Sequence, residues 1–251
     1  MGTDMAHTSE RVVILGGTSG IGLATADLLL DRGYEVVIAG RNQERLTQAF
    51  KTLDTKKADR PVTGKPVDAT DGEQLAAFFA EVGGFDHLVV TVTRNGGVTS
   101  LADLEAAEVR KHSEGKLLAH LLSVQAALGT LRADGSVTLV GAVSSQLSSP
   151  GLVVLGAINS AVESASRTLA AELAPRRVNA VSPGVIETPW WDWIPEEARA
   201  DALTGATSDT AVGRPGRPEE VAHAIAFLVE NAYTTGVVLP VDGGARLNVQ
   251  R

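Results

Sequence analysis

The chain has 251 residues and no cysteine, and 22 lysines and arginines against 30 aspartates and glutamates give a formal net charge of −8. The absence of cysteine excludes a disulfide framework, a thiolate metal site and a cysteine nucleophile, and the five histidines lack a metal-binding spacing, so no metal is expected. The negative charge argues against nucleic acid and membrane surfaces as partners. The sequence shows neither a signal peptide pattern nor a run of roughly 18 apolar residues that could cross a bilayer, so a cytoplasmic protein is expected.

Short β-branched runs alternate with longer stretches of helical periodicity from residue 11 onward, whereas residues 1–10 are polar and unpatterned and are expected to be a disordered tail or an expression remnant. Strands are predicted at 11–15, 35–39, 62–67, 87–92, 136–140, 178–181 and 237–241, and helices at 21–30, 43–53, 72–81, 104–131, 159–173 and 219–230. Because the strands are apolar at successive positions, a doubly wound parallel α/β sheet with helices on both faces is expected. No linker interrupts this pattern, which predicts one domain over residues 11–251.

A glycine-rich turn stands between the first strand and the first helix, with the sequence Gly-Gly-Thr-Ser-Gly-Ile-Gly at residues 16–22. Glycine lets the backbone approach a pyrophosphate, and the N-terminus of the following helix favours negative charge. The turn therefore predicts a dinucleotide site, and the alternative is a tight turn without a ligand. The candidate residues are Gly16, Thr18, Ser19, Gly20, Ile21 and Gly22.

The second strand ends in Ala39-Gly40-Arg41 and lacks the acid that an NAD site uses for the ribose hydroxyls. An arginine at this place suits the 2′-phosphate of NADP. We therefore predict NADP(H) as the cofactor, against the alternative that Arg41 is a solvated turn residue.

Further motifs follow in order: Val67-Asp68-Ala69, the run Arg-Val-Asn-Ala-Val-Ser-Pro-Gly at 177–184, and the segments 214–222 and 236–244. Together with the glycine-rich turn, they resemble the short-chain dehydrogenase/reductase family over nearly all of residues 11–246. The resemblance implies a sheet of order 3-2-1-4-5-6-7, a nicotinamide cofactor across the strand ends, a small-molecule substrate and a homotetramer.

The same resemblance implies further cofactor-binding residues. It places Asp68, next to Ala69, at the adenine, and it places Ile186 and Thr188, which follow Pro183 and Gly184, at the nicotinamide carboxamide. Two plainer interpretations stay open, because Asp68 could only organise the turn before the next helix and Thr188 could only cap the helix that follows it.

The family's catalytic Asn-Ser-Tyr-Lys set is missing from this sequence, since the matching positions hold Lys116, Ala142, Leu155 and Asn159. Leucine has no ionisable proton and alanine cannot hydrogen-bond a carbonyl, so the usual proton relay is predicted not to operate. The two tyrosines of the chain, Tyr34 and Tyr233, are not expected in the pocket.

Lysine and asparagine are both present, but at exchanged positions. Lys116 could reach the site from the facing helix and act as an acid or polarise an oxygen, while Asn159 takes a ribose hydroxyl or acts in catalysis. The alternative is that Lys116 belongs to a solvated polar face formed, at helical spacing, by His112, Lys116, His120 and Ser123.

Three other features each carry two interpretations. Ser144 either replaces the missing serine or belongs to a polar loop. The three tryptophans, at 190, 191 and 193, form either a wall against a flat or apolar substrate or a local core. Arg94 either binds a substrate anion or has no such role.

Three functions are compatible with these observations. The first is an NADP(H)-dependent oxidoreductase with a non-standard site that acts on a carbonyl or an activated alkene, its proton coming from Lys116, Ser144 or water. The second is a non-redox catalyst of cyclisation, isomerisation or elimination that keeps NADP as structure. The third is a catalytically inactive nucleotide-binding protein.

Overall fold

The computed structural model describes residues 10–54, 62–208 and 210–247, and its centre is a seven-stranded parallel sheet of order β3-β2-β1-β4-β5-β6-β7. This order and the doubly wound architecture confirm the fold predicted from the sequence. Residues 1–9 of the expected tail lie outside the described residues. The strands are β1 (Arg11–Leu15), β2 (Glu35–Gly40), β3 (Thr63–Pro66), β4 (Phe85–Val90), β5 (Leu131–Val140), β6 (Arg177–Pro183) and β7 (Val238–Val241).

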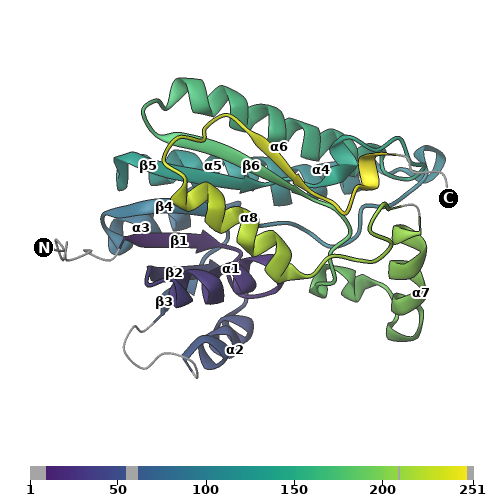
Figure 1. Cartoon of the computed structure of the whole chain (residues 1–251), viewed down its shortest axis with the longest axis horizontal. Coiled ribbons are helices and arrows are strands. Elements are labelled where there is room, and N and C mark those ends of the chain that lie inside the picture. The colour runs from purple at the N-terminus through teal and green to yellow at the C-terminus, as the bar shows by residue number, and fades with distance from the viewer. Residues whose placement is uncertain (1–9, 55–61, 209, 248–251) are drawn as a thin grey trace, which may run out of the picture.

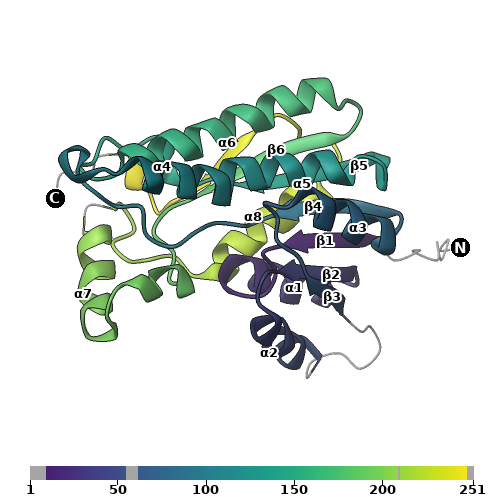
Figure 2. The same ribbon diagram turned by 180° about the vertical axis from the view of Figure 1, so that it is seen from behind.

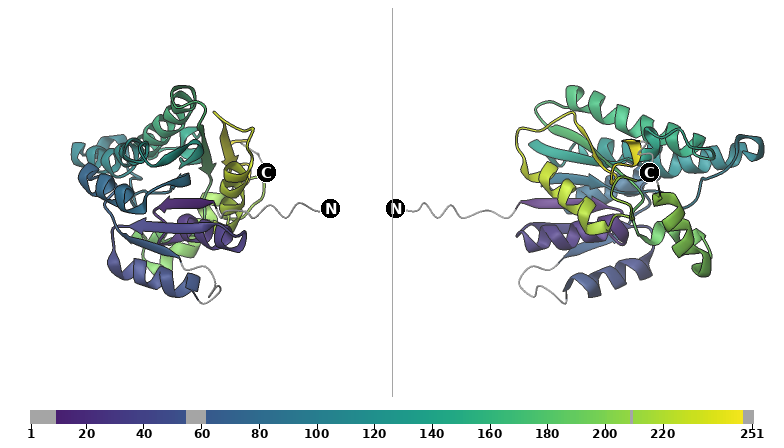
Figure 3. Two further views of the ribbon diagram at one scale, coloured as in Figure 1. Left: turned by 90° about the vertical axis from the view of Figure 1, so that its left-hand side faces the viewer. Right: turned by 45° about the vertical axis from the view of Figure 1, so that its right-hand side comes forward.

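Helices cover both faces of the sheet (Figures 1 and 2). One face carries α1 (Gly20–Asp31), α2 (Gln43–Asp54) and α8 (Pro218–Glu230), and the other carries α3 (Gly72–Val82), α5 (Ala119–Ala127) and α6 (Val153–Glu172), as the end-on view in Figure 3 shows. Successive β1 side chains point to opposite faces, so Val13 packs in one apolar cluster and Val12 in the other. The continuous apolar runs of the strands therefore fill two cores.

The predicted helix over 104–131 is wrong in its extent. It is divided into α4 (Ala106–Ser113), a π-helical turn (Glu114–Leu118) and α5, which ends at Ala127. Gly129 and Thr130 follow that end, and Leu131 begins β5, where it pairs with Phe85. The leucine-rich periodicity continues past the helix, which is why the sequence extended it.

Helix α6 begins at Val153, six residues before the predicted start at residue 159. The β-branched pair at 153–154 and Gly156 conceal its first turns from a sequence pattern. A further helix, α7 (Glu196–Thr207), was not predicted, whereas the helix expected after Thr188 in the capping interpretation is a 3-10 turn (Pro189–Trp193). Both lie beyond the carboxyl ends of the strands (Figure 1). Among the described residues, no helix combines the length and apolarity that a bilayer crossing requires.

Candidate functional site

A cleft of about 970 Å³ lies at the carboxyl edge of the sheet, where the segments after β1, β2, β4, β5 and β6 converge. All of the site residues proposed from the sequence line it. They are Gly16, Thr18, Ser19, Gly20, Ile21, Gly22, Arg41, Asp68, Ala69, Lys116, Ser144, Asn159, Pro183, Gly184, Ile186 and Thr188.

The glycine-rich turn is as tight as its sequence indicates. A Cβ on Gly22 would stand 2.2 Å from the carbonyl oxygen of Gly16, and Gly16 itself has a φ of +87°. Ser19 is the N-cap residue of α1, but its hydroxyl accepts no hydrogen bond from the first N–H groups of the helix. These N–H groups can therefore donate to a ligand. A backbone free of side chains in front of a helix N-terminus fits the diphosphate of a dinucleotide.

The end of the cleft formed by the segments after β2 and β3 carries positive charge. Arg41 and Arg45 are exposed there, and Asp68 is the single acid that lines the cleft within the described part of the chain. Partial burial opposes ionisation of Asp68, but hydrogen bonds from Thr70 and the fields of Arg41 and Arg94 outweigh it and lower the Asp68 pKa. Asp68 Oδ1 accepts from Thr70 N at 2.9 Å, so Asp68 organises its turn while facing the cleft.

At the other end, Thr188 lies in the cleft wall and also caps the 3-10 turn, because its Oγ1 accepts from Trp190 N at 3.4 Å. Ile186 is held by a bridge to Gly216. The plainer capping role of Thr188 is thus present together with a position that a cofactor could contact.

The polar stripe on α4 and α5 is buried, so the solvated-face interpretation is wrong. The exposed fraction is 9% for Lys116, 3% for His112 and zero for His120 and Ser123. The π-helical turn carries Lys116, and such turns are rare and concentrated at functional sites. The stripe therefore faces the cleft and the sheet rather than solvent.

Lys116 is held as a buried ammonium at the cleft. Its Nζ donates to the carbonyl oxygen of Gly141, at the end of β5, over 3.0 Å. Burial lowers the pKa of Lys116 to about 8, and the negative charge of Glu163 limits that fall. His120, whose Nδ1 lies 2.8 Å from the Lys116 carbonyl oxygen, is neutral near pH 7 because burial and then the charge of Lys116 lower its pKa to about 3.

Glu163 was not singled out from the sequence, although it belongs to this site. Its Oε1 accepts from Ser182 Oγ at 2.6 Å and from Ser145 Oγ at 2.8 Å. A Cβ on Gly141 would stand 3.1 Å from the same oxygen, so Glu163 packs closely against the end of β5. The sequence could have indicated Glu163 by its spacing, because it follows Asn159 by four residues and therefore lies on the same face of the helix.

Asn159 and Ser144 form a hydrogen-bonded pair next to Lys116 on the lining. Asn159 Nδ2 donates to Ser144 Oγ and to the Leu155 carbonyl oxygen, both at 2.9 Å. Asn159 Oδ1 is buried and has no hydrogen-bond partner within the described residues. This oxygen is a free acceptor for a hydroxyl such as that of a ribose, and Ser144 keeps its own proton to donate.

Neither tyrosine belongs to the lining of the cleft. Tyr34 precedes β2 and packs edge-on against His87 with ring centroids 6.0 Å apart, and Tyr233 is fully exposed. Ala142 and Leu155, which the resemblance matches to the family's serine and tyrosine, do line the cleft.

The three tryptophans make a wall of the cleft rather than a buried core. Trp190 packs edge-on against Trp191 at 4.9 Å and against Trp193 at 6.0 Å between ring centroids, and none of the three is fully buried. Trp190 Nε1 donates to the Arg94 carbonyl oxygen at 2.8 Å, which ties this wall to the segment after β4.

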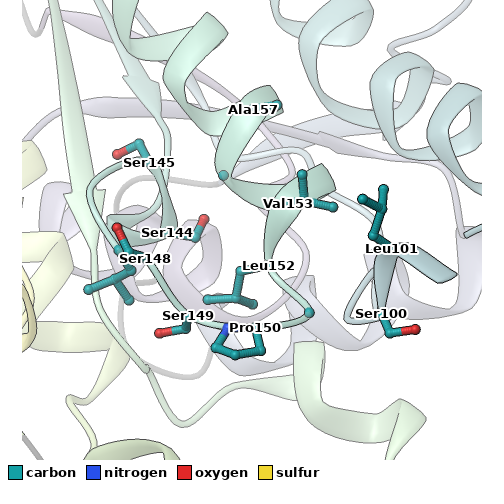
Figure 4. A pocket seen from close by; sticks show the side chains of 13 residues that line it. Ser100, Leu101, Ser144, Ser145, Ser148, Ser149, Pro150, Leu152, Val153 and Ala157 are labelled. Carbon is teal, nitrogen blue, oxygen red and sulfur yellow. The ribbon is translucent and has the colours of Figure 1, made fainter.

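A smaller hollow of about 570 Å³ shares the loop at 144–152 with the cleft (Figure 4). In that view Leu101 and Val153 lie on one side of it and Ser148 on the other. No charged residue of the described chain lines this hollow, and five of its residues also line the cleft. It extends the apolar surface near Ser144 without adding an ionisable group.

Comparison with known proteins agrees with this architecture. A family model described as enoyl-(acyl carrier protein) reductase matches residues 16–246. The short-chain dehydrogenase/reductase ATR9 of Stachybotrys chlorohalonatus is 32% identical over 248 residues, which cover 95% of this chain and 97% of that protein.

Two solved structures are close in fold. A small-chain dehydrogenase in complex with NADPH superposes with a TM-score of 0.80 at 30% identity, with 95% of this chain and 99% of that chain covered. MalC Reductase/Diels-Alderase from Malbranchea aurantiaca has a TM-score of 0.87 at 27% identity, with 95% and 96% covered.

Proposed function

Because the chain belongs to the short-chain dehydrogenase/reductase family, we propose that it is an NADP(H)-dependent oxidoreductase in which Lys116, from another position, takes over the proton-donating role of the family's tyrosine. Its substrate is a small molecule with a carbonyl group or an activated carbon–carbon double bond. The observation that carries this proposal is a buried ammonium, hydrogen-bonded to Gly141, on the lining of a cleft whose other end fits a phosphorylated dinucleotide.

The cofactor would be held by the glycine-rich turn at the diphosphate, by Arg41 and Asp68 at the adenosine end, and by Asn159 Oδ1 at a ribose hydroxyl. When bound, NADPH supplies a hydride to the substrate carbon. These residues fit that group because they combine an open backbone, a basic end and an unpartnered buried acceptor.

Lys116 supplies the proton. An ammonium has three N–H donors, and one of them is used by Gly141, which leaves others for a substrate oxygen. The Ser144 hydroxyl offers a second donor on the same wall. As negative charge develops on the substrate oxygen, Lys116 transfers a proton to it and is then reprotonated from solvent, so an alcohol leaves and a neutral amine is restored to ammonium.

A second candidate is a non-redox reaction on the same wall. MalC, which shares the fold, is named both a reductase and a Diels-Alderase. Hydrogen-bond donors that polarise a carbonyl would also activate an alkene conjugated to it, and the tryptophan wall suits a flat partner. Oxidation of NADPH in step with product formation separates the two candidates, because only the oxidoreductase consumes it.

The cofactor preference gives the first test. Replacing Arg41 by alanine should weaken NADPH binding by about 10-fold to 100-fold and leave NADH binding almost unchanged, because the arginine pairs with the 2′-phosphate alone. Nicotinamide fluorescence titration measures both affinities, with Arg167→Ala, an exposed arginine on α6, as the control. Equal affinity of the unaltered protein for the two cofactors would contradict the assignment.

We also propose a homotetramer. Strand β7 is an edge of the sheet, all of its residues are half-buried, and Phe227 on the neighbouring α8 is 46% exposed, which leaves apolar surface for another copy of the chain. Light scattering at micromolar concentration should give the mass of four chains. A monomer mass would rule the assembly out.

A further inference from the structure

The charges that line the cleft are opposite in sign to those of the whole chain. The chain has a formal net charge of −8, yet the titratable residues lining the cleft are Arg41, Arg45, Asp68, Arg94, His112 and Lys116. The first three lie at the end of the cleft that we propose binds the adenosine of the cofactor. The other three lie at the substrate end, where no acid among the described residues lines the cleft. A positive pocket in a negative protein concentrates anions.

Arg94 is partly buried and is fixed in place. Its side chain lies across Gly115, because a Cβ on that glycine would stand 2.5 Å from both Cγ and Nε of Arg94. Its carbonyl oxygen receives the Trp190 indole N–H, and the neighbouring Asn95 Nδ2 donates to the Pro189 carbonyl oxygen at 3.4 Å. Arg94 thus lies between the residue next to Lys116 and the tryptophan wall.

The guanidinium of Arg94 has no partner of its own. Its Nε is buried without a hydrogen-bond partner, and no carboxylate within the described residues forms an ion pair with it. The two other arginines that line the cleft are exposed on the adenosine side. A buried charged donor without a hydrogen-bond partner is costly, so Arg94 Nε on the lining of the cleft points to a ligand.

His112 is a second polar group on this wall. It is 3% exposed, it lines the cleft, and its Nε2 forms no hydrogen bond, although Glu108 Oε2 lies 3.3 Å away. Burial lowers the pKa of His112, which leaves the ring neutral near pH 7 and able to donate one hydrogen bond. The imidazole therefore adds a donor or acceptor without cancelling the charge of Arg94.

We propose that the substrate is a carboxylate, bound through its anionic group by the Arg94 guanidinium, with its apolar body against Trp190 and Trp191. A planar guanidinium matches a carboxylate in a two-point contact. Because Arg94 crosses Gly115, this contact holds the rest of the molecule beside Lys116. The inference deepens the proposed function by naming a substrate class, but the binding it asserts is independent of turnover.

The tryptophan fluorescence of the protein, excited selectively over tyrosine, reports on this wall alone, since the three tryptophans are residues 190, 191 and 193. The probes are cyclohexanecarboxylate and cyclohexanecarboxamide, which match in shape, differ in charge and do not absorb where tryptophan does. With saturating NADP⁺, the carboxylate should change the emission and bind at least about 10-fold more tightly than the amide. Arg94→Gln should abolish that preference while retaining the Trp190 contact, which is to a backbone oxygen.

Two further variants sharpen the test. Arg94→Lys keeps the charge without the planar donor pair and should retain only part of the preference. Arg110→Gln removes an equal charge from the exposed face of α4 and should retain all of it. Equal binding of carboxylate and amide, no binding of the carboxylate, a preference that survives Arg94→Gln, or tighter binding of cyclohexyl phosphate would each overturn the proposal. NADP⁺ titration of the same samples shows separately whether the cofactor site functions.

Discussion

Replacing Lys116 by methionine is expected to lower the rate of NADPH-linked reduction of any substrate that the unaltered protein accepts by about 10²-fold to 10⁴-fold. Methionine fills a similar volume at this buried position but cannot donate a proton. The loss should lie in kcat more than in KM, since the proton is transferred in the transition state. An unchanged rate would make Ser144 or water the donor.

The same variant should be more stable than the unaltered protein, which separates lost chemistry from lost folding. Burial lowers the Lys116 pKa from 10.5 to about 8, so the folded state holds the proton less tightly than the unfolded state. This difference corresponds to about 3 kcal/mol at neutral pH, and loss of the Gly141 hydrogen bond reduces the expected gain to about 1–3 kcal/mol. Urea unfolding should show the gain below pH 8 and its disappearance by about pH 10.5. A less stable variant would show that the ammonium contributes to folding.

The pH dependence of the rate follows from the same group. As a general acid Lys116 must be protonated, so the rate should fall as the pH rises through about 8. Glu163 raises the Lys116 pKa, and Glu163→Gln should move this limb to lower pH while keeping an acceptor for Ser145 and Ser182. His120, neutral above about pH 3, does not titrate in that range. If the pH at which the rate falls is unchanged in Glu163→Gln, the titrating group that controls the rate is not Lys116.

The sequence predicted the sheet well because buried parallel strands leave a strong local signal. β1 and β2 are almost wholly buried and read as unbroken β-branched runs. The first turns of α6 left no such signal, since two valines and Gly156 disfavour a helix locally and the helix is supported by packing. The sequence also could not reveal α7, whose residues lack a strong amphipathic pattern.

The residues that we propose bind the cofactor were accessible to sequence analysis because they lie in short contiguous motifs. The chemical half of the site was not. The spacing of His112, Lys116 and His120 is the same whether that face meets water or a cleft, and the choice depends on α6 and the end of β5, which are distant in sequence. The same holds for the contacts among Glu163, Ser182 and Gly141. These residues come from three separate parts of the chain, and only the tertiary fold brings them together.

Simple ketones and secondary alcohols are expected to give negligible NADP-linked turnover, at least about 10²-fold below relatives with a complete tyrosine relay. Leu155 and Ala142 line the cleft where a hydroxyl would have to be oriented, and neither can donate or accept a proton. Substrates without a carboxylate also forgo Arg94. A panel of neutral ketones and alcohols, assayed by the absorbance of NADPH, measures this turnover. Robust reduction by the unaltered protein would show that a proton donor other than the missing serine and tyrosine serves these substrates.

Introducing the family's serine, tyrosine and lysine tests whether their absence is what limits turnover of these neutral substrates. Ala142→Ser, Leu155→Tyr and Asn159→Lys together should raise turnover of the neutral panel, because positions 142, 155 and 159 all line the cleft and the new side chains would supply the missing proton relay. The new lysine would stand near the ammonium of Lys116, and two like charges in a buried site oppose each other's protonation. Adding Lys116→Asn should therefore raise the gain further, whereas the same substitution in the unaltered background should abolish reduction of a carboxylate substrate. If Lys116→Asn instead lowers the activity of the restored protein, the native lysine supports a tyrosine relay rather than replacing it.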